Sequence, residues 1–110
     1  MMLPNYENAY VPGSKLTGYL LSETHAVGKA KAKYFRSLGY TENNVDQLKQ
    51  DILMIAKSYE ITNKFETNFG LKYTIDGQLS TPNGSVVRIT TVWVVEPPDD
   101  RPRFVTAYPV

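Results

Sequence analysis

The chemistry available to this chain centres on its single histidine. His25 stands in the segment SETHAVGKAKAKYFRSLGY, residues 22–40. An imidazole, with its ordinary pKa of about 6.5, can accept or donate a proton at neutral pH. Gly28 lets a ligand approach the start of the predicted helix, whose N-terminus favours anions, and Lys29 and Lys31 can neutralise a phosphate. His25 is therefore a candidate general acid or base, and the alternative is a polar residue that only begins a helix.

A second group of polar residues lies near the C-terminus. Arg88 and Thr91 fall on opposite faces of one predicted strand, with Trp93 on the face of Thr91, and Thr106 and Tyr108 point the same way from the last strand. The hydroxyls of Thr106 and Tyr108 could bind a phosphate that Arg88 clamps with two hydrogen bonds. The alternative is that threonine and tyrosine simply favour strands, and Trp93 is expected in the core.

The basic residues after His25 divide into two groups. Lys31 falls inside the apolar arc of the predicted helix, where a lysine usually lays its methylene groups along the edge of the core. The alternative is that its ammonium group reaches the edge of the sheet. Lys29, Lys33 and Arg36 share the opposite face, which predicts a solvated surface that could also contact an RNA backbone.

The first half of the chain predicts an arm and three helices. Residues 1–14 form an extended arm, and the stretch SKLTGYLLS forms a short helix that Gly18 weakens. The second helix begins at Thr24 and stops at Gly39. The third runs from about residue 44 to residue 58, capped by Thr41 or Asn43. The residues expected to be buried are, in the arm, Leu3, Tyr6, Tyr10 and Val11; in the second helix, Val27, Ala30, Tyr34 and Leu38, with Phe35 at the edge; and in the third, Val45, Leu48, Ile52, Ile55 and Tyr59.

The apolar period then changes from 3.6 to 2, which indicates strands. Four of them are predicted, in ITNKFETNF, LKYTIDGQL, VVRITTVWVVE and RFVTAYP, and Asn83-Gly84 marks a hairpin turn. Helices followed by strands with tight connections predict an α+β fold, in which N-terminal helices pack on one face of a four-stranded antiparallel meander. We expect one domain over 1–110, with the arm at 1–14, the helical part at 15–58 and the sheet at 60–108.

Composition narrows the possible functions. The chain of 110 residues has no cysteine, which excludes disulfides and thiolate metal sites and fits a reducing compartment. No apolar run approaches the roughly 20 residues of a membrane-spanning helix, and the N-terminus lacks the pattern of a signal peptide, so we expect a cytoplasmic protein. The net charge of +1 provides no global attraction for nucleic acid. The carboxylates of EPPDD, residues 96–100, indicate a solvated turn, and we expect neither metal nor cofactor.

Three blocks of the sequence resemble one family. They are LPN…KLTGYLLSETHAVGKAKAKYFRSLGY, TPNG…RITTVW and FVTAYP. The pattern resembles an uncharacterised bacterial domain family found alone or at the C-termini of larger proteins in polymorphic-toxin and phage-head contexts. That family in turn resembles the barnase, EndoU, colicin and RelE-like ribonuclease fold. The wider class includes metal-independent RNA-cleaving toxins that a small antitoxin or immunity protein holds in check.

The resemblance implies roles for particular residues. The block H-x-V-G-K supplies His25, Gly28 and Lys29, and Lys31 follows two positions later. The remaining blocks supply Arg88, Thr91 and Trp93, and then Thr106 and Tyr108. One departure is Ala26, where the family pattern prefers proline, which weakens a rigid entry into the helix but removes no reactive group.

These implications together predict a small toxin that is a metal-independent endoribonuclease. A ribose 2′-OH attacks the adjacent phosphate and leaves a cyclic phosphate. The expected catalytic residues are His25, Lys31, Arg88, Thr91, Thr106 and Tyr108, and the expected substrate-binding residues are Gly28, Lys29, Lys33 and Arg36. The partners are RNA and a small antitoxin or immunity protein. The alternative is a non-catalytic protein- or RNA-binding module, for example one that uses the sheet edge at RFVTAYP, and the near-neutral charge favours it because ribonuclease toxins are often basic.

Overall fold

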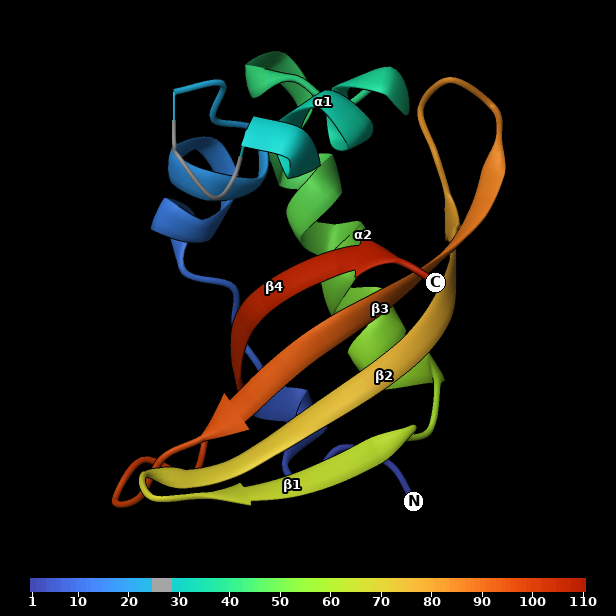
Figure 1. Cartoon of the computed structure of the whole chain (residues 1–110). Helices are drawn as coiled ribbons and strands as arrows, with labels where there is room; N and C mark the ends of the chain where they lie inside the picture. The colour runs from blue at the N-terminus through green and yellow to red at the C-terminus, as the bar shows by residue number, and fades with distance from the viewer. Residues whose placement is uncertain (25–28) are drawn as a thin grey trace.

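Helices precede a four-stranded sheet in the computed structural model, which describes residues 1–24 and 29–110 (Figure 1). The 3₁₀ and π turns are η1 Tyr6–Asn8, η2 Gly13–Lys15, η3 Leu16–Leu20 and η4 Glu42–Asn44, the α-helices are α1 Lys29–Ser37 and α2 Val45–Ser58, and the strands are β1 Asn63–Thr67, β2 Gly70–Ser80, β3 Val86–Val95 and β4 Arg103–Pro109. The strands lie in the order β1-β2-β3-β4, each antiparallel to the next. The predicted α+β class is confirmed.

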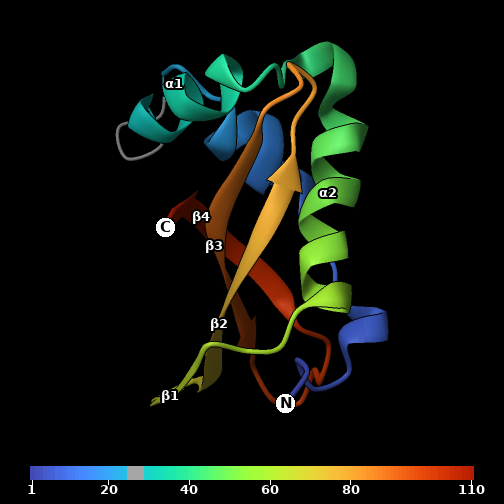
Figure 2. The ribbon, with the colours of Figure 1, turned by 90° about the vertical axis from the view of Figure 1, so that its right-hand side faces the viewer.

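The core lies between α2 and one face of the sheet (Figure 2). The register sets Tyr73 opposite Trp93, and both are buried on that face. Cross-strand partners share a face of the sheet and side chains alternate along each strand, so this pairing places the odd-numbered residues around Tyr73 on the core face, as the alternation predicted. At Gly77 a Cβ atom would lie 2.9 Å from the ring of Tyr59 and 3.0 Å from Ile55, so the absence of a side chain lets α2 approach the sheet closely.

The predicted stripe of the third helix is confirmed in α2. Leu48, Ile52 and Ile55 are fully buried, and Val45 and Tyr59 pack against the margin of the core. The helix follows a capping box in which the Thr41 side chain accepts a hydrogen bond from a backbone N–H and the Asn44 side chain reaches back to the Thr41 N–H. Strong local signals at both the start and the face of this helix made it predictable.

The buried face of α1 differs from the prediction. Ala32 and Phe35, and Leu38 just beyond the helix, are buried, whereas Ala30 is exposed and Tyr34 only half-buried. The core side is therefore turned towards Phe35, which the prediction placed at the edge of the stripe. The reason is the position of α1, which packs against η3 instead of lying along the sheet as α2 does (Figure 2).

The end of α1 is held by a distant turn. Gly39 has a φ of +101°, which agrees with its prediction as the stop of this helix. The Asn83 backbone N–H donates to the Leu38 carbonyl at 3.1 Å, and the Asn83 side chain donates to the Ser37 carbonyl at 2.9 Å. The β2–β3 hairpin turn therefore satisfies carbonyl groups that the helix leaves unpaired.

The N-terminal arm packs on the core through Leu3, Val11 and Tyr6 as predicted, but it contains the 3₁₀ turn η1 where extended chain was expected, and it meets the sheet at one residue, Tyr10. Leu3 and Val11 are buried. Tyr10 forms an isolated parallel bridge with β4, in which its N–H donates to the Pro102 carbonyl and its carbonyl accepts from the Phe104 N–H, each at 3.0 Å. The short helix predicted for SKLTGYLLS is instead a 3₁₀ turn followed by a π-helix. Among the helices in the described ranges, none combines the length and apolar character needed to cross a bilayer.

Candidate functional site

Lys31 carries its charge to the edge of β4. Its Nζ atom lies 3.4 Å from the Ala107 carbonyl oxygen, to which it donates, and 5.2 Å from the centre of the Tyr108 ring. The side chain is half-buried. Phe35, one helical turn later on the same side of α1, is anchored in the core and so aims Lys31 at the strand. Of the two interpretations of Lys31, the one in which the ammonium reaches the sheet edge is confirmed.

A tyrosine that the sequence placed only in a helical stripe joins this cluster. The Tyr19 hydroxyl, from the π-helix η3, lies 3.2 Å from the Thr106 hydroxyl oxygen. The Lys15 ammonium stands 5.2 Å from the centre of the Tyr19 ring. Tyr19 shares the helical spacing of Leu16 and Leu20, which predicts burial, and no local signal indicates where its hydroxyl ends.

Arg88 lies next to this cluster on the face of the sheet that points away from α2. Tyr108 pairs with Thr90, and Arg88 precedes Thr90 by two residues on the same face, so Arg88 is the diagonal neighbour of Tyr108. Diagonal neighbours have Cβ atoms about 7–8 Å apart, within reach of long side chains. The Arg88 side chain is exposed and forms no ion pair within residues 1–24 and 29–110. Lys31 thus brings one positive charge to the Tyr108 ring, and Arg88 occupies the diagonal position on the same face of the sheet.

Thr91 lies apart from these residues, in the core. It is fully buried on the opposite face, opposite Ala107 in the neighbouring strand. Its hydroxyl donates to the Ile75 carbonyl at 3.2 Å and accepts from the Trp93 indole N–H at 2.9 Å. The predicted burial of Trp93 is confirmed. Because the Thr91 hydroxyl has these two partners and no exposure, its surroundings support a structural role in place of the predicted contact with phosphate.

Arg36 fastens α1 to the chain around it. Its Nε and Nη2 atoms donate to the Leu21 carbonyl at 3.1 and 2.6 Å. The guanidinium also forms a close ion pair with Glu42, and its Nε atom lies 3.4 Å from a carboxylate oxygen of Glu23. The hydrogen bond from Arg36 lowers the pKa of Glu42, and the same bond raises the pKa of Arg36. Arg36 therefore does not share the solvated face predicted for it, whereas Lys29 and Lys33 are exposed as expected.

Two predicted site residues, His25 and Gly28, lie outside the described residues, and their roles stay predictions. The loop EPPDD is an exposed turn, in which Glu96 pairs with Arg103 and the Asp99 carboxylate accepts from the Arg101 N–H. No group of three or more histidine, cysteine, aspartate or glutamate side chains gathers as a metal site within the described ranges.

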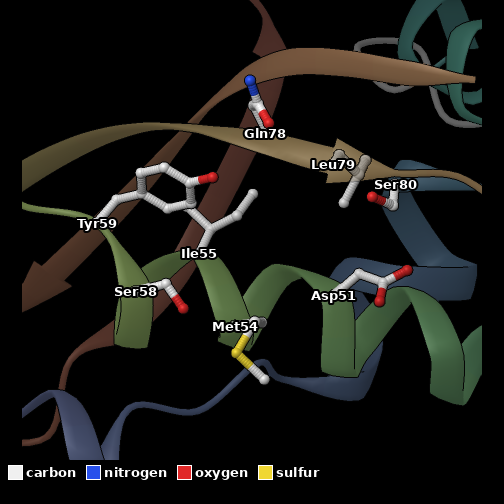
Figure 3. A pocket seen from close by; sticks show the side chains of 8 residues that line it. All are labelled: Asp51, Met54, Ile55, Ser58, Tyr59, Gln78, Leu79 and Ser80. Atoms are coloured by element: carbon white, nitrogen blue, oxygen red, sulfur yellow. The ribbon is translucent and has the colours of Figure 1, made fainter.

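A pocket between α2 and β2 has the wrong chemistry for an anion. It encloses about 210 Å³. Eight residues line it: Asp51, Met54, Ile55, Ser58, Tyr59, Gln78, Leu79 and Ser80 (Figure 3). The one charged lining group, Asp51, is negative and already accepts from the Tyr40 hydroxyl at 2.6 Å and from Gln47 at 2.7 Å. Burial, helped by this bond, raises the pKa of Tyr40. The β4 edge is the better candidate site.

Comparisons with known proteins place the fold beside one solved assembly. A family model described as "Domain of unknown function (DUF6883)" matches residues 2–110. No protein of curated function matches the chain. Among solved structures, a chain of a contact-dependent growth inhibition toxin–immunity protein complex from Klebsiella pneumoniae 342 has a TM-score of 0.73 at 18% sequence identity, with 97% of each chain covered. At this identity the likeness shows a common fold over nearly the whole length of both chains.

Proposed function

We propose that this chain, which belongs to the DUF6883 family, a domain of unknown function, is a small bacterial toxin that a dedicated antitoxin or immunity protein neutralises. The fold it shares with a chain of a toxin–immunity complex supports this class. We further propose that the toxin is a metal-independent endoribonuclease. The observation that carries this second step is the convergence of Lys31, Thr106 and Tyr108 on one edge of the sheet, with Arg88 diagonal to Tyr108.

The cluster fits a phosphodiester better than a neutral ligand. The Lys31 ammonium and the Arg88 guanidinium both carry charge at neutral pH, and Tyr108, which is 40% exposed, offers a hydroxyl beside them. The Thr106 hydroxyl, which shares a hydrogen bond with the Tyr19 hydroxyl, is a second hydroxyl on the same strand. Positive charge and oriented hydroxyls are the groups that bind non-bridging phosphate oxygens.

The proposed reaction is an internal transfer within RNA. The ribose 2′-oxygen attacks the adjacent phosphorus and loses its proton, the bond from phosphorus to the 5′-oxygen breaks, and that oxygen gains a proton. The products are a 2′,3′-cyclic phosphate and a free 5′-hydroxyl. His25 carries one of the two protons, as base or as acid, and solvent can carry the other. Lys31 and Arg88, with Lys29 in support, stabilise the charge that builds on the phosphorane.

The magnitudes expected of these groups differ. One positioned acid or base contributes about 10²–10⁴-fold in rate, and one preorganised charge or donor about 10²–10³-fold. Thr106 and Tyr108 act by positioning, and Thr91 has no contact with substrate in this proposal because its hydroxyl is buried with two partners.

The rival function is a non-catalytic binding module. The edge suggested for it, at RFVTAYP, is partly occupied: Tyr10 pairs with its beginning and the Lys31 ammonium sits on the Ala107 carbonyl. The observation that still favours a binding module is the opposite edge of the sheet, at β1, where all five residues are exposed.

The two functions are separated by incubating cellular RNA with the protein in excess EDTA. We expect cleavage by the wild-type protein, fragments with 5′-hydroxyl ends that a polynucleotide kinase labels directly, and a loss of about 10²–10⁴-fold in His25→Ala. Equal cleavage by both proteins would show that His25 takes no part in the mechanism. No cleavage by either protein would contradict the ribonuclease proposal.

Induction in a bacterial host tests the wider class. A toxin arrests growth unless the neighbouring gene is co-expressed, and His25→Ala should relieve the arrest without that gene. A host that grows normally under strong induction of the wild-type protein contradicts the toxin proposal and leaves the binding module.

A further inference from the structure

The outer edge of β1 is bare. Every residue of Asn63–Thr67 is exposed, and within the described chain this strand pairs only with β2. The hairpin it forms carries two large apolar side chains into solvent, Phe65 at 47% and Phe69 at 77% exposure. An unpaired strand edge presents free backbone N–H and C=O groups and readily pairs with another strand.

The sequence of this strand is complementary to itself when read backwards. The strand is NKFET. If two copies lie antiparallel and cross at Phe65, Lys64 of each stands opposite Glu66 of the other, and Asn63 stands opposite Thr67. Opposite charges in directly facing positions stabilise a strand pair, and like charges destabilise it. Every facing position in this one register is therefore a compatible pair.

The two faces of the strand agree with this register. Lys64 and Glu66 pair with Tyr73 and Leu71 of β2 and so share one face, while Phe65 pairs with Lys72 and lies on the other. Two ion pairs would form on the first face and a ring pair on the second, where the Lys72 ammonium already stands 5.5 Å from the Phe65 ring centre. Within the described residues neither Lys64 nor Glu66 has an ion-pair partner.

We propose that β1 is a homodimerisation edge whose occupant is β1 of a second copy of this chain. A two-fold axis through Phe65 makes the contact isologous, so it closes after two copies. The two sheets become one continuous sheet, and the same register brings Phe69 at the hairpin tip towards the residues that precede β1 in the partner. The β4 edges with Lys31 lie at the two far ends of this sheet, so the dimer leaves the candidate site open, and the proposal is independent of the ribonuclease.

The test is a charge swap read by sedimentation velocity over a wide range of protein concentration. The wild-type protein should show a monomer–dimer equilibrium. Lys64→Glu sets two carboxylates against each other at each facing position, and Glu66→Lys sets two ammonium groups against each other there. Each variant should therefore raise the dissociation constant about tenfold or more. The double swap K64E/E66K exchanges the charges within one strand and should restore dimerisation.

Mixing the two single variants provides the sharpest readout. Lys64→Glu and Glu66→Lys repel themselves but complement each other, so an equimolar mixture should form a heterodimer that neither variant forms alone. Because both residues are exposed, circular dichroism should show the same fold in the wild-type protein and in all the variants. A wild-type protein that stays monomeric at every concentration overturns the proposal. The proposal is also overturned if the charge swaps leave the dissociation constant of the dimer unchanged, or if the mixture of the two variants does not associate.

Discussion

The two edges of the sheet are treated in opposite ways. At β4 the N-terminal arm adds a backbone bridge at Tyr10, and α1 brings the Lys31 ammonium onto the Ala107 carbonyl. At β1 the described residues provide no cover, and every side chain of the strand is exposed. A free edge is a hazard that proteins usually cover or charge, and here one edge is covered and the other only carries Lys64 and Glu66.

The comparison shows how covering an edge can create a site. The elements that close β4 come from distant parts of the chain, so the edge also receives their side chains: Lys31 lies beside Tyr108, and Tyr19 contacts Thr106. At β1 the side chains come only from the β1–β2 hairpin. That edge has charge and exposed rings, which suit association with another strand, but no cluster of polar groups from several elements.

The largest expected difference between the edges is in stability, and the same substitution tests both. Phe104 of β4 is fully buried and packs edge-on against Trp93 with ring centres 5.5 Å apart. Phe104→Ala should lower the free energy of unfolding by about 3–5 kcal/mol. Phe65→Ala in β1 should lower it by less than about 1 kcal/mol, because that ring is half in solvent.

Urea denaturation at low protein concentration, where the chain is monomeric, measures both values. Similar losses for the two variants would mean that β1 contributes to the core as β4 does, and the contrast between a covered and a bare edge would then be wrong.

The next effect is on the proposed cleavage of RNA, where two lysines form a matched pair. Lys31→Met keeps the methylene packing and removes the charge at the β4 edge, and we expect the single-turnover rate to fall about 10²-fold. Lys64→Met makes the same change at β1 and should leave the rate unchanged. Lys31→Arg should retain part of the activity. A full rate in Lys31→Met removes this lysine from the catalytic cluster, whereas equal losses in both variants would point to general attraction of RNA.

The smallest effect is the pH dependence of the ion pair between Arg36 of α1 and Glu42, which joins α1 to the segment that follows it. Arg36 lowers the pKa of Glu42 below its ordinary 4.5, so the pair contributes stability above that pH and loses it as the pH falls further and Glu42 is protonated. Glu42 is exposed, which keeps the contribution small. Glu42→Gln should remove this part of the acid dependence.

Hydrogen exchange of the α1 amides measures the effect between neutral pH and about pH 3.5 when it is expressed as protection factors, corrected for the intrinsic exchange rate at each pH, with the β1 amides as the internal control. α1 protection factors that fall equally in the wild-type protein and in Glu42→Gln as the pH is lowered would show that the Arg36–Glu42 pair does not hold this helix.

Much of the fold was predictable because it depends on local pattern. In α2, a capping box at Thr41 and a stripe at the 3.6 period agree, and in the strands the alternation at period 2 set the facing residues correctly. The same alternation already placed Thr91 beside Trp93 and away from Arg88. The catalytic role of Thr91 came from the family resemblance, and its buried hydrogen bonds support a structural role.

What the sequence alone determined is the order of elements, the faces of the strands and the stripe of α2, because each follows from neighbours a few residues apart. Only the tertiary structure decided which side of α1 is buried, where the Lys31 ammonium ends, and that Arg36 binds the Leu21 carbonyl. These outcomes depend on contacts between segments as far apart as Lys31 and Ala107. Periodicity along one helix contains no information about the direction from which such a partner approaches.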